Sequence, residues 1–249
     1  MSSITVALIT LVFTFAGSLC GLFLRFVLPD NHLDEDARDV MQLGAGLIAT
    51  MTALLLGLLI NSANNSLDAL STELTQASTT IVELDQSLAS YGPETAELRQ
   101  SLRKCVVAAI ESIGEEVPNE KFDIGKALRK IQSKLRSLSP QNNAHDILQS
   151  QALQEAQQLT HSRLLLLEHR SNRISGIFLF VLIFWLIVIF ISFGLLAPRN
   201  RTLIGVLFVY ALSVSAAIFV LMEMNNPYKG FISISAAPLH NAQEQLGRQ

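Results

Sequence analysis

Small and polar residues recur at regular spacing inside a very apolar stretch of the sequence. From residue 46 onward they follow one another every three or four positions: Gly46, Thr50, Ala53, Gly57, Asn61 and Asn64. A helix places such positions on the same face, so they form one stripe opposite a face of leucines. The stripe has two interpretations. Small residues allow helices to pack closely, and hydroxyl and amide groups can line a water-filled ion pathway at the axis of an oligomer.

The sequence offers little for covalent or metal chemistry. The closest histidines, His161 and His169, are eight positions apart, so a helix does not place them together as metal ligands. Cys20 lies in an apolar run and Cys105 in the hydrophilic middle, so we expect no disulfide between them. The sequence contains no phosphate-binding glycine loop, nucleophile elbow or thiol redox pair. We therefore expect no enzyme, no cofactor, no metal site and no nucleic-acid partner.

The composition is that of a membrane protein. Hydrophobic residues occupy 50% of the 249 positions, and a helix needs about 20 mostly apolar residues to cross the hydrocarbon core of a bilayer. Suitable stretches occur at residues 4–28, 40–63, 174–196 and 203–222. The first lacks the basic start and the short apolar core of a cleaved signal peptide, so we expect four membrane spans.

The four expected spans place both termini and the long segment 64–173 on the same side of the membrane. Lysine and arginine near the membrane are almost equally frequent on the two sides, so the positive-inside rule does not decide the orientation. A helical segment without disulfides suits the cytosol. We therefore expect a multi-pass cell-membrane protein whose termini and residues 64–173 are cytoplasmic.

The hydrophilic middle begins as a continuation of the second span. No glycine or proline occurs between Leu58 and Tyr91, so we expect one helix to run from the membrane into the aqueous phase. At "YGPE", Gly92 is expected in the left-handed conformation that ends a helix and Pro93 in the first turn of the next helix. The apolar residues of the first helix alternate at spacings of three and four, the seam of a packed or coiled helix: Leu67, Leu70, Leu74, Ala77, Ile81, Leu84, Leu88 and Tyr91.

Further helices complete this segment. A hairpin about Gly92 would bring Arg99, on a helix over residues 93–114, close to Asp85, and we expect an ion pair there; an exposed pair contributes only about 0.2–1 kcal/mol. The basic amphipathic stretch 121–140 is either a helix on the membrane surface or a bundle helix with a solvated basic face. A last helix, residues 144–169, then leads to the third span.

Polar residues mark the ends of the last two spans. Pro198 stops the third span, and Glu223 lies at the edge of the fourth. Pro227 ends the fourth span because it disfavours helix at Asn226, and Gly230 permits a reversal of the chain. The residues that follow alternate between apolar and polar, which is typical of an extended segment.

Together these features predict an all-α membrane protein with four transmembrane helices and a helical cytosolic domain inserted between spans 2 and 3. The first two spans occupy residues 1–63, the soluble helical domain 64–173, and the last two spans 174–222. We expect residues 223–249 to be strapped over the domain or over a neighbouring subunit.

Several segments in combination resemble one protein family. They are "LLLGLLINSANNSLDALSTEL", "LDQSLASYGPETAELRQSLR", "FGLLAPRNRT" and "SAAIFVLMEMNNPYKGFISISAAPL". The chain resembles the bestrophin-like family of bacterial four-span membrane proteins over about residues 40–246. More distantly, it resembles the bestrophin anion channels, which are pentamers of four-span subunits whose second span lines the pore.

The distant resemblance departs from the channel pattern in places. The fourth span of those channels is followed by an Asn-Pro-Phe segment, and here Asn226, Pro227 and Tyr228 stand at that place. The acidic residues of a calcium clasp do not follow, since Lys229 and Gly230 occupy the next positions. We therefore expect no calcium site. The bulky aromatic residues of a pore neck are also absent from the second span.

The resemblance implies a homo-oligomeric ion channel or pore, pentameric, surrounded by membrane lipid and conducting inorganic ions along the second span. The pore-lining candidates are Thr50, Ala53, Gly57, Asn61 and Asn64. The candidates for assembly and structure are Gly92, Pro93, Arg99, Pro198, Glu223, Asn226, Pro227, Tyr228 and Gly230. The alternative is a non-conducting membrane scaffold or signalling protein whose helical domain binds a soluble partner.

Overall fold

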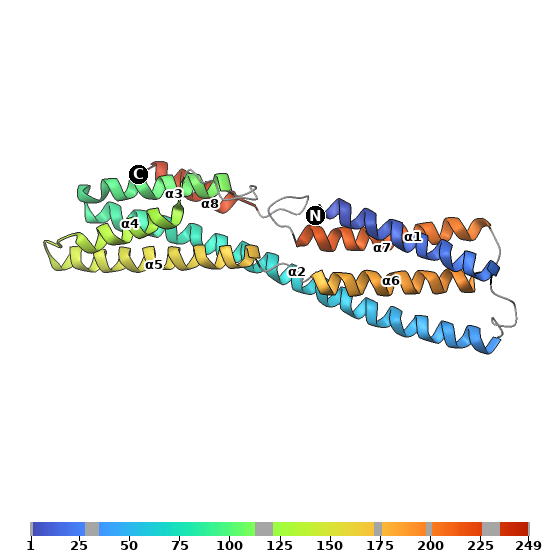
Figure 1. Cartoon of the computed structure of the whole chain (residues 1–249). Coiled ribbons are helices and arrows are strands. Elements are labelled where there is room, and N and C mark those ends of the chain that lie inside the picture. The colour runs from blue at the N-terminus through green and yellow to red at the C-terminus, as the bar shows by residue number, and fades with distance from the viewer. Residues whose placement is uncertain are drawn as a thin grey trace. The chain divides into compact units, whose positions relative to one another are not determined.

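The protein is helical throughout the residues that the computed structural model describes, which are 2–27, 35–112, 122–171, 176–197, 201–225 and 235–248 (Figure 1). Four helices are long and apolar enough to cross a membrane: Ser3–Val27, Asp36–Tyr91, Gly176–Leu196 and Thr202–Met224. The chain divides into two compact units. The first comprises Met1–Asn65 and Ile174–Asn226, and the second Ser66–Arg173 and Pro227–Gln249.

The first unit is built from the apolar helices. It holds α1 (Ser3–Val27), the first part of α2 (Glu35–Tyr91), α6 (Gly176–Leu196) and α7 (Arg201–Met224). Helix α1 contacts both α6 and α7. The apolar core of this unit takes residues from every one of these helices: Val6, Leu59, Ala63, Leu182, Leu186, Ile218 and Leu221. In Figure 1 the first part of α2 lies at the edge of this bundle, next to α6.

Helices α1 and α6 approach each other through glycines. A Cβ atom at Gly21 would overlap the backbone carbonyl of Ile191, and one at Gly194 would overlap that of Ser18. Such close approach of two backbones is the usual role of small residues between membrane helices. The spacing of Gly17 and Gly21 in "GSLCG" was the signal in the sequence, and the sequence analysis did not use it.

The buried face of α1 also carries hydroxyl groups that donate hydrogen bonds to backbone carbonyl oxygens. Thr10 and Thr14 each donate to the carbonyl oxygen four residues earlier, at 2.9 and 2.7 Å. Across the contact with α7, Ser215 donates to the carbonyl oxygen of Ala7 at 2.7 Å. These hydroxyls can be buried at little cost because each donor has an acceptor.

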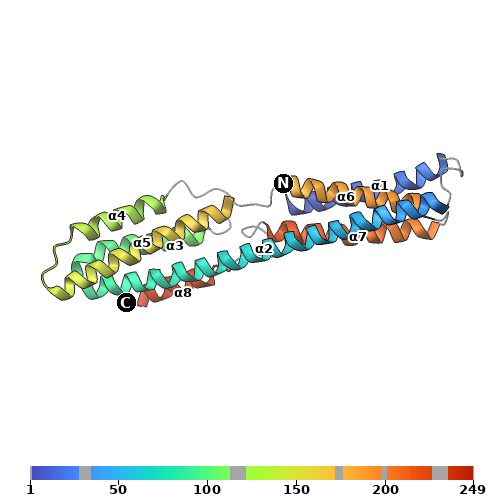
Figure 2. The ribbon, with the colours of Figure 1, turned by 90° about the horizontal axis from the view of Figure 1, so that it is seen from below.

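The second unit is a helical bundle around its own core (Figure 2). It holds the rest of α2 with α3 (Ala96–Ser112), α4 (Ile124–Ser137), α5 (Asn143–Ser171) and α8 (Ala237–Arg248). Helix α4 contacts α3 and α5, and α8 contacts α3. The seam expected on α2 is confirmed from Leu70 onward, and Leu67, at its start, is only half-buried. The buried residues are Leu70, Leu74, Ala77, Ile81, Leu84, Leu88 and Tyr91.

A tight turn links α2 to α3. Gly92 has φ 131° and ψ −174°, the only positive φ in the part of the chain that the structure describes. Gly92 is therefore not in the left-handed helical conformation that we expected, because its ψ lies far from the values of that conformation. The region of φ and ψ that it occupies is open almost only to glycine. The end of α2 is capped instead by Thr95, whose hydroxyl donates to the carbonyl oxygens of Leu88 at 2.5 Å and Gly92 at 2.8 Å. Pro93 begins the short 3-10 helix η2 (Pro93–Thr95).

The expected ion pair between α2 and α3 is present. Arg99 donates from Nε and Nη2 to the two carboxylate oxygens of Asp85, at 2.8 and 2.7 Å. The hydrogen bond to Asp85 raises the pKa of Arg99 further above its usual value. The environment differs from the expected one, because the Asp85 side chain is only 3% exposed. Loss of one partner would leave a buried charge, which costs far more than breaking a surface pair.

The basic amphipathic stretch forms α4, and its apolar face is occupied inside the bundle. Leu128, Ile131 and Leu135 are buried in the core of the second unit. Gln132 donates to the carbonyl oxygen of Ala156 on α5 at 3.0 Å. Of its basic residues, Lys134 is half-buried and pairs with Glu97 of α3, and four others are exposed: Lys126, Arg129, Lys130 and Arg136. This arrangement favours the bundle helix over the helix on the membrane surface.

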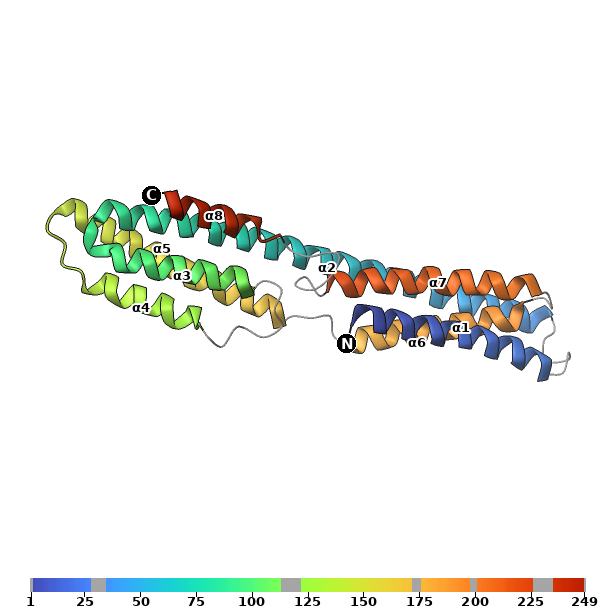
Figure 3. The ribbon, with the colours of Figure 1, turned by 90° about the horizontal axis from the view of Figure 1, so that it is seen from above.

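Helix α8 was not predicted. The extended segment that we expected falls on residues 226–234, which lie outside the described residues. From Ala237 the chain is helical, and Leu239, Ala242 and Leu246 are buried in the core of the second unit. In Figures 2 and 3, α8 runs alongside α2. The spacings of three and four between these residues were the signal in the sequence.

We expect Gly21→Ala and Gly194→Ala each to destabilise the first unit, because the added methyl group would overlap the facing backbone. Overpacking of this kind costs about 1–3 kcal/mol. The measurement is thermal unfolding of the purified protein in detergent. The control is Gly44→Ala, whose Cβ would meet no atom within 4 Å. Equal melting temperatures for the Gly21 and Gly44 variants would contradict the close contact.

We expect Arg99→Met to cost about 3–5 kcal/mol, because it leaves the buried Asp85 carboxylate without its cation. The double variant Asp85→Leu/Arg99→Met should recover most of this loss. Arg103→Met, an exposed position on the same helix, is the control. Urea unfolding of the full chain in detergent measures all of these variants. A loss below about 1 kcal/mol for Arg99→Met would mean that the pair behaves like one on the surface.

Candidate functional site

Helix α2 carries the predicted stripe in its apolar stretch, and the rest of the described chain covers little of that stretch. In its most apolar stretch 17% of the residues are buried, compared with 39% in α1. Between residues 36 and 65 the buried residues are Ala45, Thr52, Leu59 and Ala63. Their spacings of seven and four place them along one narrow line of the helix, which we call the α2 seam. The α2 seam is the fully buried part of this stretch, and Leu55, Leu56 and Ile60 are half-buried on either side of it.

The predicted stripe lies on the other side of the helix. Thr50, Ala53, Gly57, Asn61 and Asn64 are all exposed, as is Gly46. One residue advances an α-helix by about 100°, so Thr50 lies roughly 160° around the helix from Thr52 of the α2 seam. The line from Thr50 to Asn61 therefore lies on the side of α2 away from the buried α2 seam.

The glycines of the stripe have open space around them. A Cβ atom at Gly46 or Gly57 would meet no atom within 4 Å, in contrast with Gly21 and Gly194. Close packing inside the described chain therefore does not explain why small residues occupy these positions. What remains is contact with another molecule or the lining of an aqueous pathway.

The stripe adjoins an exposed apolar surface on the same helix. The leucines Leu43, Leu47, Leu54 and Leu58 are 75, 65, 67 and 59% exposed. Leu58 follows Gly57 directly, and so lies about 100° from it around the helix. Leu54 lies only about 40° from Thr50, and Leu43, 18 residues before Asn61, lies on the line of the stripe itself. The exposed leucines are therefore adjacent to the stripe and meet it at Leu43, and the expectation that they form the opposite face was wrong.

The hydroxyl of Thr50 has a fixed orientation. It donates to the carbonyl oxygen of Leu47 at 2.7 Å. Thr52, on the α2 seam, does the same toward Ile48, also at 2.7 Å. Because the hydroxyl hydrogen of Thr50 is engaged with the backbone, its exposed oxygen is presented to the surroundings as a hydrogen-bond acceptor.

The other predicted site residues do not join the stripe. Gly92, Pro93 and Arg99 belong to the turn and the ion pair of the second unit, where their roles are structural. Glu223 lies near the end of α7, as expected for a residue at the edge of the span, and it is buried there. The remaining predicted residues lie outside the described ones: Pro198, Asn226, Pro227, Tyr228 and Gly230.

A buried carboxylate in the second unit was missed by sequence reasoning. Ser87 of α2 donates to Glu155 Oε1 on α5 at 3.1 Å, and Gln151 donates to the same oxygen at 3.0 Å. The other oxygen, Oε2, is buried without a hydrogen-bond partner among the described residues. No signal distinguished Glu155 in the sequence, because it lies among other polar residues in "QEAQQ".

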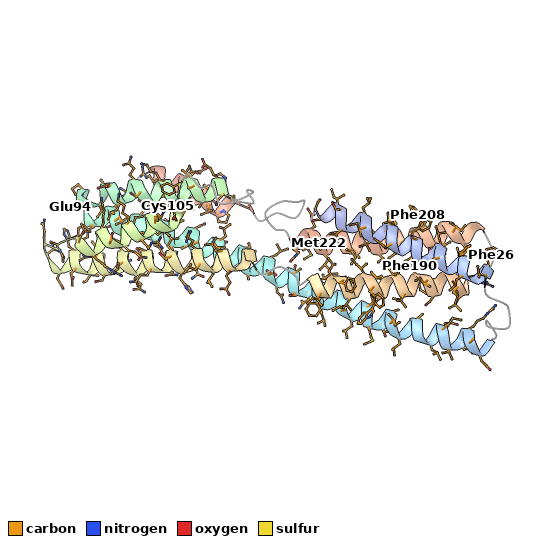
Figure 4. All side chains as sticks on the ribbon, in the orientation of Figure 1. Phe26, Glu94, Cys105, Phe190, Phe208 and Met222 are labelled. Atoms are coloured by element: carbon orange, nitrogen blue, oxygen red, sulfur yellow. The ribbon has the colours of Figure 1, made fainter. Side chains whose placement is uncertain are left out.

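The described residues hold no evident centre for bond chemistry. Burial raises the pKa of the Cys105 thiol to about 11, so at neutral pH it is a protonated and poor nucleophile. Figure 4 shows Cys105 among the helices of the second unit. Across the described ranges, no three His, Cys, Asp or Glu side chains gather as a metal site would require.

Comparison with known proteins gives one match. A family model described as the bestrophin-like domain matches residues 11–239. The matched range contains the whole of α2 and most of α1, and extends into α8. No curated protein and no solved structure matches the chain.

We expect cysteine substitutions on α2 to distinguish its two exposed sides. In a Cys20→Ser background, Gly57→Cys should react with a membrane-impermeant thiol reagent, while the neighbouring Leu58→Cys should not. The two positions lie at the same depth and about 100° apart, so depth cannot account for a difference. Modification rates in reconstituted vesicles provide the measurement. Equal rates at the two positions would contradict a water-facing stripe.

Proposed function

The chain belongs to the bestrophin-like family, and on that premise we propose that it is a homo-oligomeric ion channel or pore whose pathway is lined by α2. The observation that carries this proposal is the exposed stripe of Thr50, Ala53, Gly57, Asn61 and Asn64. In the part of the subunit that the structure describes, these side chains are exposed on a helix that is apolar enough to cross a membrane.

An oligomer with α2 at its axis accounts for both exposed sides of the helix. An asparagine amide that faces hydrocarbon loses its hydrogen bonds to water, which costs roughly 2–7 kcal/mol. Facing a water-filled axis, Asn61 keeps those bonds. The exposed leucines then face lipid or the neighbouring subunits. Irregular or polar surface at membrane depth is tolerated where it lines such a cavity.

The finer details of the proposal follow from the resemblance to the bestrophin channels. The subunit number would be five, and the α2 helices of the subunits would surround one axis. Both termini and the second unit would be cytoplasmic, and membrane lipid would surround the first unit. The proposed activity is the passive flow of inorganic ions, without catalysis and without a bound cofactor.

A second candidate function is favoured by the surface of the second unit. Exposed basic residues gather on α3 and α4, which contact each other: Arg103, Lys104, Lys126, Arg129, Lys130 and Arg136. A surface of this kind attracts an acidic partner. The protein would then be a non-conducting membrane scaffold that holds a soluble protein through its helical unit.

We expect the purified protein in planar bilayers to give discrete single-channel currents under a salt gradient. Asn61→Leu should abolish or reduce the conductance, because it replaces a polar group on the pathway by a larger apolar one. Thr50→Val should also change the conductance, since it replaces the hydroxyl group by a methyl group of similar size.

The matched control is Thr52→Val, which makes the identical change on the α2 seam. Its conductance should equal that of the unsubstituted protein. Equal effects of the Thr50 and Thr52 changes would remove the stripe from the pathway. Silence from monodisperse protein across voltage, pH and calcium would contradict the channel and favour the scaffold.

A further inference from the structure

The exposed side of α4 in the second unit carries only positive charge. Helix α4 holds five lysine and arginine residues and no aspartate or glutamate. Two of the five pair with carboxylates of the same unit, Lys126 at 3.7 Å from Asp123 and Lys134 with Glu97. The others are exposed within about 120° of the helix circumference and make no ion pair among the described residues: Arg129, Lys130 and Arg136. Because these side chains only donate hydrogen bonds, we call this surface the donor face.

The exposed side of α2 in the same unit has the opposite character. Residues 66–91 contain no lysine, arginine or histidine. Thr75, Thr79 and Glu83 are exposed and spaced four apart, so they lie within about 80° of the helix circumference. Thr75 and Thr79 donate their hydroxyl hydrogens to backbone carbonyl oxygens at 2.9 and 3.2 Å. Their outward oxygens are left to accept hydrogen bonds, as the Glu83 carboxylate does, and we call this surface the acceptor face.

The two faces lie on opposite sides of the second unit. Helix α2 is bonded to α3 through Asp85 and to α5 through Ser87. Helix α4 contacts the same two helices. Figures 2 and 3 show α4 on one side of the unit and α2 on the other. The donor face of a chain therefore cannot reach the acceptor face of the same chain.

From this arrangement we propose that the second units of neighbouring copies associate head to tail, with the donor face of one copy packed on the acceptor face of the next. The inference rests on the homo-oligomer of the proposed function, and it adds the surfaces through which the second units meet. A contact between two different faces of one chain repeats from copy to copy, and it closes into a ring when the rotation between copies allows.

Charge complementarity favours a second copy over an acidic soluble partner. A second copy satisfies both faces at once, because each chain supplies the donors for one neighbour and the acceptors for the other. An acidic partner on the donor face would leave the acceptor face without donors. Pairing of two donor faces is excluded, since like charges juxtaposed across an interface repel.

The test is crosslinking between copies of the full-length protein in lipid vesicles. In a Cys20→Ser background, Ser133→Cys places a thiol on the donor face and Thr79→Cys places one on the acceptor face, both at exposed positions. We expect a bifunctional thiol reagent to link chains with both substitutions into a ladder of multimers. Chains with one substitution should stay single. The background alone, whose remaining Cys105 is buried, should also give no ladder.

The matched control combines Thr79→Cys with Gln157→Cys, an exposed position on α5 outside both faces. It carries the same number of thiols, so a ladder of equal yield would mean that the reagent reports random encounters between copies. Co-expression of the single variants Thr79→Cys and Ser133→Cys provides a second comparison. These chains should give linked dimers and no longer multimers, because each carries one thiol.

Charge variants test what holds the faces together. Added to the crosslinking pair, Glu83→Lys should lower the yield of linked chains about tenfold, because it sets a cation against the donor face. Further addition of Arg129→Glu and Lys130→Glu should restore much of the yield, since opposite charges then face each other again. A yield that Glu83→Lys leaves unchanged would overturn the role of charge in this contact. Glu111→Lys, on α3 and outside both faces, is the control for the charge change.

The outcomes separate this inference from the proposed function. Light scattering of the purified protein measures how many copies associate. An oligomer whose paired thiols link no better than those of the Gln157 control would overturn the head-to-tail contact and leave the homo-oligomer intact. Links between chains that carry only Thr79→Cys would also overturn it, because they place two acceptor faces together. A folded monomer would overturn the homo-oligomer and this inference together.

Discussion

The narrow α2 seam is the constraint on which the rest of this account depends. Ala45, Thr52, Leu59 and Ala63 hold the apolar stretch of α2 to its own subunit, with Leu55, Leu56 and Ile60 half-buried beside them, and the residues on the far side are exposed. Elsewhere in the first unit the buried contacts are broader, as the glycine contact between α1 and α6 illustrates. A membrane helix attached along one line, with a polar stripe on its far side, needs a second surface to face that stripe. The proposed association of several copies around an axis would supply one.

The same helix is held firmly in the second unit. There α2 contributes the seam from Leu70 to Tyr91 to the core. The buried Asp85 binds Arg99 through both of its oxygens, and Ser87 donates to the buried Glu155. Directional contacts of this kind fix the rotation of a helix about its axis more strictly than apolar packing does. These contacts therefore fix which face of α2 the core of the second unit covers.

The sequence predicted the positions of the helices better than it predicted which of their faces other helices cover. Hydrophobic length located the four apolar helices, and the alternation of three and four located the buried seam of α2. The hairpin expected at Gly92 located the ion pair between Asp85 and Arg99. Sequence reasoning missed α8, whose short apolar pattern follows a segment that reads as extended, and the conformation of Gly92, because the cap comes from Thr95. Periodicity placed Thr50 and Asn61 on one face of α2. It could not tell that this face is uncovered, because burial depends on helices distant in the sequence.

The most direct measurement is a cryo-electron microscopy map of the purified protein in lipid nanodiscs, at a resolution that places side chains. The account predicts several copies around a common axis, with α2 innermost and with Thr50, Gly57 and Asn61 facing that axis. A map in which the line from Thr50 to Asn61 faces lipid, or in which another helix surrounds the axis, would contradict the account. So would a monomer that retains the fold described above.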